Sequence, residues 1–301
     1  MMTDLPEFDA YLSLAEVSED DHRWAFGTGF ADPLAGLDVA VPPGIDAAAL
    51  AAYCLMLGDD ALIYSHRLQQ WVTRAPELEE ETALANIALD LLGQARMLLT
   101  RSGQAEGAAG SKGRDEDQLA FFRDEGEYRN VRLAERADAD FAELAARLLV
   151  FSAWRLALLR QLTSAADPVL AAIADKGAKE LAYHRDYAAG WVIRLGDGTD
   201  FSHARMQAGL DAVWPLTGEL FTPHPVEAAL PGIAADVAAL RAEFDAAVDA
   251  VLAEATLRKP ESRPLARVAG RAGRDGVHTE AMGYILAELQ SIARAHPDAT
   301  W

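Results

Sequence analysis

Two short groups of polar residues lie at helical spacing within apolar segments and could bind a metal ion. Asn86, Asp90 and Gln94 follow one another at four-residue steps, and so do Glu180 and His184. Residues four apart lie on the same face of a helix, one turn from each other. A buried carboxylate has to be ion-paired, hydrogen-bonded, protonated or bound to metal. These residues therefore indicate either a metal site or a buried polar network.

Four-helix bundles can hold a di-iron centre, whose donor set is demanding. Such a centre takes a Glu from each of two helices and a Glu-x-x-His pair from each of the other two. Asp60 and Asp90 could supply two carboxylates, but Gly93 stands three residues after Asp90, where the paired histidine is needed. The sequence has no histidine between His66 and His184. The first paired motif is therefore absent.

The second paired motif fails as well. Tyr183 stands three residues after Glu180, and His184 comes one residue later, which turns a helical side chain by about 100°. The middle of the preceding predicted helix, residues 148–159, contains no carboxylate. We therefore expect no metal in this chain, and a hydrogen bond from His184 to a buried acid. A mononuclear metal site is the open alternative, with the ligands Asp60, Asp90, Glu180 and His184.

Composition restricts the classes of protein to which the chain can belong. It has 301 residues and a formal net charge of −20, with 47 acidic residues against 27 basic ones. This charge disfavours nucleic acid and anionic membranes as partners, because phosphate binding requires clustered Lys and Arg. The longest apolar runs, such as 144–154, are interrupted by arginines (Arg147, then Arg155) before the roughly 18 residues that a membrane span needs. We expect no membrane segment.

The amino terminus and the cysteine usage indicate a cytoplasmic protein. The first residues are acidic and lack the basic and apolar parts of a secretion signal. The single cysteine, Cys54, excludes an internal disulfide, and its place on an apolar helical face indicates a buried structural thiol.

The elements that position the polar residues are predicted to be helices throughout. Apolar residues recur at three- and four-residue steps, with Asp46 and Asp167 as N-caps and Pro168 at a first helical position. The expected helices are 46–75, 77–100, 115–135, 141–163, 167–195, 202–214, 234–257 and 279–295. The predicted class is all-α, a ferritin-like four-helix bundle with additional C-terminal helices.

The remaining segments complete the expected domain organisation. Residues 1–45 are rich in Gly, Pro and aromatic residues and are expected to form an extended N-terminal arm, with 46–301 as a single ferritin-like domain. The helix 77–100 is apolar nearly all round and is therefore expected to be central and buried. The stretches 101–114 and 258–276 are expected to be surface loops, solvated rather than bound to an anionic cofactor tail.

Several sequence blocks together resemble the C-subunit family of bacterial phenylacetyl-CoA epoxidases. The resemblance runs from about residue 50 to Trp301, and residues 1–45 fall outside it. Its blocks are LGDDALIYSHRLQQW (57–71), APELEEETALANIALDLLGQAR (75–96), DEDQLAFFRDEGEYRNVRLAE (115–135), KELAYHRDYAAGWVIRLGDGT (179–199), WPLTGELF (214–221) and GVHTEAMGYILAELQ (276–290).

This resemblance implies a ferritin-like, non-catalytic subunit of a multicomponent monooxygenase. A related A subunit would carry the di-iron centre and bind the CoA thioester, and a reductase subunit would deliver electrons from NADPH for epoxidation of the aromatic ring. The resemblance implies no catalytic, cofactor-binding or metal-binding residue in this chain. The family's blocks place six core polar positions of a vestigial site at Asp60, Asn86, Asp90, Gln94, Glu180 and His184.

Two other functions are alternatives to the structural subunit. One is a stand-alone ferritin-like metal-binding protein or metalloenzyme, which would need ligands that the helices do not provide. The other is a self-associating helical protein of unrelated purpose. For the structural subunit, the expected contact elements are the helices 46–75 and 77–100 and the segment 124–130.

Overall fold

The computed structural model describes residue 34 and residues 36–299. Contacts divide the chain into two compact units, residues 1–35 and residues 36–301, and only the second is described below. The predicted arm over residues 1–45 lies mostly outside the described residues. Its extended form and the domain division at residue 45 therefore stay predictions.

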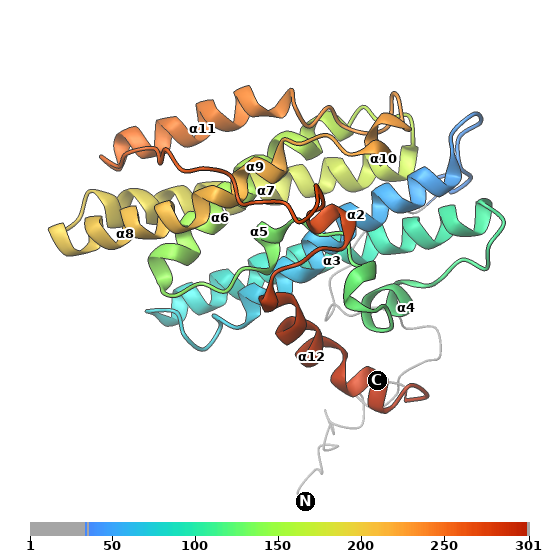
Figure 1. Cartoon of the computed structure of the whole chain (residues 1–301), viewed down its shortest axis with the longest axis horizontal. Helices are drawn as coiled ribbons and strands as arrows, with labels where there is room; N and C mark the ends of the chain where they lie inside the picture. Colours follow the sequence, from blue (N-terminus) through green and yellow to red (C-terminus); the bar gives the residue numbers. More distant parts are fainter. Residues whose placement is uncertain (1–33, 35, 300–301) are drawn as a thin grey trace, which may run out of the picture. The chain divides into compact units, whose positions relative to one another are not determined.

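Four long helices form the bundle of the second unit. They are α2 (Ala47–Gln69), α3 (Leu78–Ala108), α6 (Phe141–Leu162) and α7 (Pro168–Gly196). Figure 1 shows α2 and α3 running side by side, and α6 is paired with α7 in the same way. Within residues 36–299 there is no strand, only an isolated bridge between Val268 and Arg271. The all-α prediction is confirmed, and the helical architecture agrees with a ferritin-like bundle.

Aspartate caps set where three of these helices begin. The Asp46 carboxylate accepts hydrogen bonds from the N–H groups of Ala48 and Ala49, at 2.9 and 3.1 Å. Asp140 and Asp167 cap α6 and α7 in the same way. A cap satisfies backbone donors that lack a partner inside the helix. The starts predicted at Asp46 and Asp167 are confirmed.

The central helices are α2 and α6. Helix α3 was predicted to be central and buried, but one of its sides is exposed. Every residue from Ala142 to Leu159 on α6 is buried, and so are 16 of the 23 residues of α2. On α3, by contrast, Leu89 and Leu92 are 51% and 40% exposed. The apolar composition of α3 is therefore only partly used by the core of this chain.

Helix α2 is also the one described helix that is long and apolar enough to cross a membrane. Its qualifying 18-residue window has a mean hydropathy of 1.4, contrary to the expectation that no segment would reach this level. However, 72% of that window is buried inside the structure, as in the core helix of a soluble bundle. The composition of α2 is explained by its central position.

The helix predicted over 115–135 is divided into three short elements. They are α4 (Glu116–Phe121), η1 (Glu125–Glu127) and α5 (Arg132–Glu135). The division has a long-range cause, because carboxylates of α2 accept the backbone N–H groups of Arg129 and Val131, both at 2.8 Å. These bonds hold the intervening chain extended.

Helix α3 continues to Ala108, so the loop predicted over 101–114 begins later than expected. Gly103 lies inside the helix, and a Cβ atom there would be 1.8 Å from the Arg114 carbonyl oxygen. This glycine allows the returning chain to approach α3 closely, and it does not end the helix.

The C-terminal third adds helices around the bundle. They are α8 (Asp200–Val213), η2 (Trp214–Leu216), α9 (Thr217–Leu220), α10 (Pro225–Ala228), α11 (Leu240–Glu254), η3 (Gly273–Asp275) and α12 (Glu280–Ala295). Helices α8 and α11 pack on α6, and α12 contacts α2 and α4. Helix α11 begins six residues later than predicted, because the Asp236 carboxylate caps a turn by accepting the N–H groups of Ala238 and Ala239.

Candidate functional site

The polar centre of the bundle is organised around Asp60 of α2, which is fully buried. Arg274 of η3 binds both carboxylate oxygens of Asp60, at 2.9 and 2.7 Å. Arg155 of α6 approaches the same carboxylate, with its Nη1 atom 3.9 Å from Oδ2. The Val131 N–H group donates a further hydrogen bond at 2.8 Å. One carboxylate is thus held between two guanidinium groups.

The network continues from Arg155 toward α7. The Nε atom of Arg155 donates to the Gln94 side-chain oxygen at 3.1 Å, and the Gln94 amide donates to Glu180 at 2.8 Å. Lys176 forms an ion pair with Glu180 one turn away on the same helix. Gln94 and Glu180, both predicted as polar core positions, therefore belong to one chain of alternating charges and dipoles that ends at Asp60.

His184 is buried and hydrogen-bonded as predicted, and its partner is Asp90. The distance from His184 Nε2 to Asp90 Oδ2 is 2.9 Å. The Asp90 side chain is 38% exposed, so the acid lies at the surface of the bundle and not in its interior. The Nδ1 atom of His184 is buried and has no hydrogen-bond partner among the described residues. The second polar pair is therefore separate from the Asp60 network.

Asn86 does not belong to the core, contrary to the prediction. Its side chain is exposed and makes no hydrogen bond within residues 36–299. The four-residue spacing places Asn86, Asp90 and Gln94 on one side of α3, but only the last is fully buried. The geometry of the helix explains this increase in burial from Asn86 to Gln94, since each four-residue step turns the side-chain direction by about 40° around the helix axis. The stripe thus crosses from solvent into the bundle.

The residues at the bundle centre do not fit a di-iron site. Within the described part of the chain, no three His, Cys, Asp or Glu side chains are grouped so that they could hold a metal ion. Two guanidinium groups lie beside Asp60, where a metal centre would need carboxylates or histidines. The mononuclear alternative is disfavoured for a further reason, because two of its ligands, Asp60 and His184, lie in separate hydrogen-bond networks.

Burial and charge act in opposite directions on these groups. Burial raises the pKa of the Asp60 carboxyl, and Arg274 and Arg155 oppose that shift. Burial lowers the pKa of Arg155 to about 10, although the charge of Asp60 opposes the change. At neutral pH the Arg155 guanidinium is thus still charged, which disfavours a metal cation beside it.

The arginines that complete this network were not predicted from the sequence. Arg274 lies in the stretch that we expected to be a solvated loop, yet its guanidinium reaches the bundle core. Arg147 and Arg155 were visible as cations within a buried apolar helix. A buried cation requires a buried acid, so these two positions were the signal that could have predicted an ion-pair network.

Cys54 is a buried thiol, as predicted. Burial raises the pKa of the Cys54 thiol, which keeps it protonated and unreactive.

Other buried ion pairs surround the centre and have no evident chemical role. Three of these buried pairs are Arg101–Asp167, Arg123–Asp59 and Arg147–Asp138. The first two join residues more than 60 positions apart in the sequence, and all three satisfy charges that would otherwise be costly to bury.

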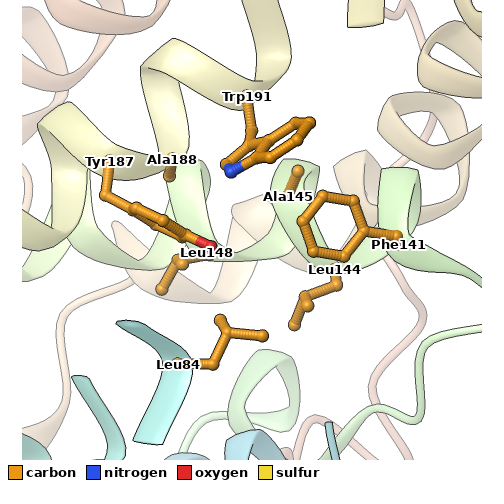
Figure 2. Close-up of a pocket in the computed structure, with 8 residues that line it drawn as sticks. All are labelled: Leu84, Phe141, Leu144, Ala145, Leu148, Tyr187, Ala188 and Trp191. Atoms are coloured by element: carbon orange, nitrogen blue, oxygen red, sulfur yellow. The ribbon is translucent and has the colours of Figure 1, made fainter. Parts of the chain in front are cut away.

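An aromatic crevice between α3, α6 and α7 is a further feature of the interior (Figure 2). Tyr187 and Trp191, which line it, both donate to the Glu80 carboxylate, in the case of Trp191 at 2.7 Å. The crevice has no room for a water-sized molecule. We interpret it as packing. Its lining residues are Leu84, Phe141, Leu144, Ala145, Leu148, Tyr187, Ala188 and Trp191.

Comparison with known proteins agrees with the resemblance seen in the sequence. The family model described as phenylacetic acid catabolic protein matches residues 40–301. The chain belongs to this family. It is 43% identical over 254 residues to the C subunit of the 1,2-phenylacetyl-CoA epoxidase of Escherichia coli strain K12, and this match covers 84% of the chain and 99% of the relative. Family members are thus similar to this chain over the whole bundle and the C-terminal helices.

Proposed function

We propose that the chain is the non-catalytic structural subunit of a multicomponent di-iron monooxygenase that epoxidises the aromatic ring of phenylacetyl-CoA. It pairs with a metal-bearing catalytic subunit, stabilises it, and contributes no cofactor of its own. The complex also contains a reductase. The observation that carries this proposal is the pair of guanidinium groups, from Arg155 and Arg274, beside Asp60 at the bundle centre.

The charges at the centre support a structural role. Asp60 is already paired with two cations, and Glu180 is paired with Lys176. Iron entering this centre would have to displace arginines whose hydrogen bonds also satisfy backbone carbonyls, among them Leu57 and Met56. Because removing one partner from a buried ion pair costs about 3–5 kcal/mol, this exchange is unfavourable.

A stripe of three leucines on α3, formed by Leu78, Leu89 and Leu92, is the surface that we propose for the catalytic subunit. Leu78 is 72% exposed, and the other two lie within about 40° of it around the helix. A long-lived subunit interface is more apolar than ordinary surface. The stripe supports one of the predicted contact elements. Helix α2, the other predicted helical contact, is mostly buried within this chain and exposes less surface to a partner.

Co-expression with the catalytic subunit, the sister chain with Glu-x-x-His motifs, tests the pairing. Wild-type chain should elute with it as a stable hetero-oligomer in size-exclusion chromatography. The double change Leu89→Glu and Leu92→Glu should abolish co-elution, because it buries carboxylates in the interface. Phe201→Glu on α8 is the matched control, since Phe201 is also an exposed apolar helical residue. Equal loss with both variants would contradict the proposed surface.

Turnover measurements test the division of roles. Epoxidation of phenylacetyl-CoA should require the catalytic subunit and should be absent with this chain and the reductase alone. Activity of this chain without its sister would overturn the proposal in favour of a stand-alone metalloenzyme.

A further inference from the structure

The segment 258–271, which we call the basic strap, is the most strongly basic part of an acidic chain. It connects α11 to η3 and carries five cations and a single carboxylate, Glu261, whereas the whole chain has a net charge of −20. Residues 261–271 are exposed without interruption. The strap therefore presents positive charge to solvent on a molecule whose surface is otherwise rich in carboxylates.

Four of these cations have no carboxylate partner among the described residues. Lys259 is paired with Asp245 and Asp249, at 2.9 and 2.8 Å. The guanidinium groups of Arg267 and Arg271 donate only to the carbonyl oxygens of Gly270 and Asp275. Carboxylates greatly outnumber cations in this chain, so a shortage of carboxylates does not explain why these arginines are unpaired. The unpaired arginines are Arg258, Arg263, Arg267 and Arg271.

The strap is nevertheless held in a defined conformation. The Leu265 N–H group donates to the Pro215 carbonyl at 2.7 Å, and Arg132 donates to the Ala266 carbonyl at 2.9 Å. Val268 and Arg271 exchange two backbone hydrogen bonds of 3.0 Å across a turn at Gly270, whose φ is +80°. A fixed binding segment loses less conformational entropy on association than a flexible one.

Apolar side chains alternate with the unpaired arginines. Leu265 and Val268 lie between them in sequence and are 39% and 63% exposed. Arginine is enriched at protein interfaces, and the buried core of an interface is more apolar than the rest of the surface. A single phosphate group fits less well, because Arg263 and Arg267 are four residues apart in a segment without helix, a reach of up to about 13 Å. A flat acidic protein surface matches this spread of charge better.

We propose that the basic strap binds an acidic surface on another subunit of the same complex, separately from the α3 leucine stripe. This inference rests on the proposed function, since it assumes that the chain works within a multisubunit assembly. Guanidinium groups of the strap would pair with carboxylates of that subunit, and Leu265 and Val268 would pack at the centre of the contact.

Charge reversal of the strap tests this proposal with the full set of epoxidase subunits. The variant combines Arg263→Glu, Arg267→Glu and Arg271→Glu. Its control reverses the same number of exposed cations elsewhere, with Lys112→Glu, Arg160→Glu and Lys179→Glu. Affinity for each purified subunit is measured at low and at high salt, after circular dichroism has established that both variants fold.

The strap variant should bind one subunit more weakly, by on the order of tenfold, and the salt dependence of that binding should decrease. The control should bind like the wild type. If the strap variant binds every subunit like the control, or if only self-association or CoA binding changes, the strap proposal is wrong while the structural role stands. If the wild-type chain binds no subunit, the proposed function fails together with it.

Discussion

The arginines of the bundle centre and those of the basic strap differ in what lies opposite them. At the centre Arg274 binds Asp60, beside it Arg147 binds Asp138, and all four side chains are buried or nearly so. In the strap, Arg263 and Arg267 are exposed and face no carboxylate of the described chain. The same residue type thus completes the fold in one region and is left available in the other.

Solvation explains why the two regions carry different information. A buried guanidinium has to be neutralised inside the chain, so its pairing is a condition of folding. An exposed guanidinium is solvated and needs no partner, and an exposed ion pair contributes little to stability. Buried ion pairs therefore indicate which segments the fold brings together, whereas ordered surface cations without a partner indicate an interface.

Breaking the centre should have the largest effect on stability. Asp60→Ala would leave two buried guanidinium groups without their carboxylate, which should lower the free energy of unfolding by about 3–5 kcal/mol. Urea unfolding followed by circular dichroism measures this change. Asp175→Ala is the matched control, because it removes an exposed carboxylate paired with Lys179 and should cost less than about 1 kcal/mol. Similar losses in both variants would contradict the importance of burial.

Close backbone packing around α3 should give the next largest effect. Gly103→Ala would bring a methyl group against the Arg114 carbonyl and should destabilise the fold by about 1–3 kcal/mol. Gly93→Ala lies on the same helix with open space around it and should stabilise the helix by about 0.5–1 kcal/mol. Denaturant midpoints of the two variants on either side of the wild type would support this packing, and midpoints shifted in the same direction would not.

A smaller, pH-dependent effect on stability is expected at His278. This residue lies between η3 and α12, and its buried side chain contacts Glu135 at the end of α5. Its ring nitrogens face two acceptors, Glu135 Oε2 at 2.9 Å and the Tyr128 carbonyl at 3.1 Å, so the doubly protonated ring satisfies both. Burial alone would lower the pKa of His278, but the hydrogen bond and charge of Glu135 outweigh it and raise the pKa above its ordinary value.

This raised pKa determines the direction of the pH dependence. The stabilising contribution is fully present below the pKa of the unfolded chain, about 6.5, and is lost as pH rises through the higher pKa of the folded chain. The stability difference between wild type and His278→Gln should therefore shrink from pH 6 to pH 9 in thermal unfolding. A difference that grows with pH would contradict the assigned protonation.

Neutralising the strap should have the smallest effect on the isolated chain. Arg263→Ala and Arg267→Ala remove exposed cations that form no ion pair with the described residues, and each should change the free energy of unfolding by less than about 0.5 kcal/mol. Thermal unfolding of each variant measures this. A loss of several degrees in melting temperature would indicate that these arginines belong to the fold and not to an interface.

The sequence predicted the local features of the fold well and the long-range ones poorly. Helix starts at Asp46 and Asp167 follow from short-range capping, which a single sequence reveals. Arg274 could not be placed, because its partner Asp60 is 214 residues away and the intervening stretch has the composition of a solvated loop. Gly103 lies in a stretch that was predicted to be a loop, but it is inside α3 and allows the returning chain to pack closely.

The sequence predicted most of the residues of the candidate site, but not which of them contact each other. The polar residues Asp60, Gln94, Glu180 and His184 do lie in the interior or at its edge. Their individual partners were not predicted: Glu180 pairs with Lys176 and Gln94, and His184 pairs with Asp90, which is partly exposed. Helical spacing gives the face on which a residue lies, but it does not give the neighbour that another helix places opposite.

Counting iron in the purified chain is the most direct test of the claim that arginines take the place of metal at the bundle centre. The chain is expressed with its catalytic sister in iron-rich medium, the two are separated, and iron is measured in each by plasma mass spectrometry. We predict substoichiometric iron in this chain and two irons in the sister. Two irons bound to this chain, lost together with Asp60 or His184, would contradict the account.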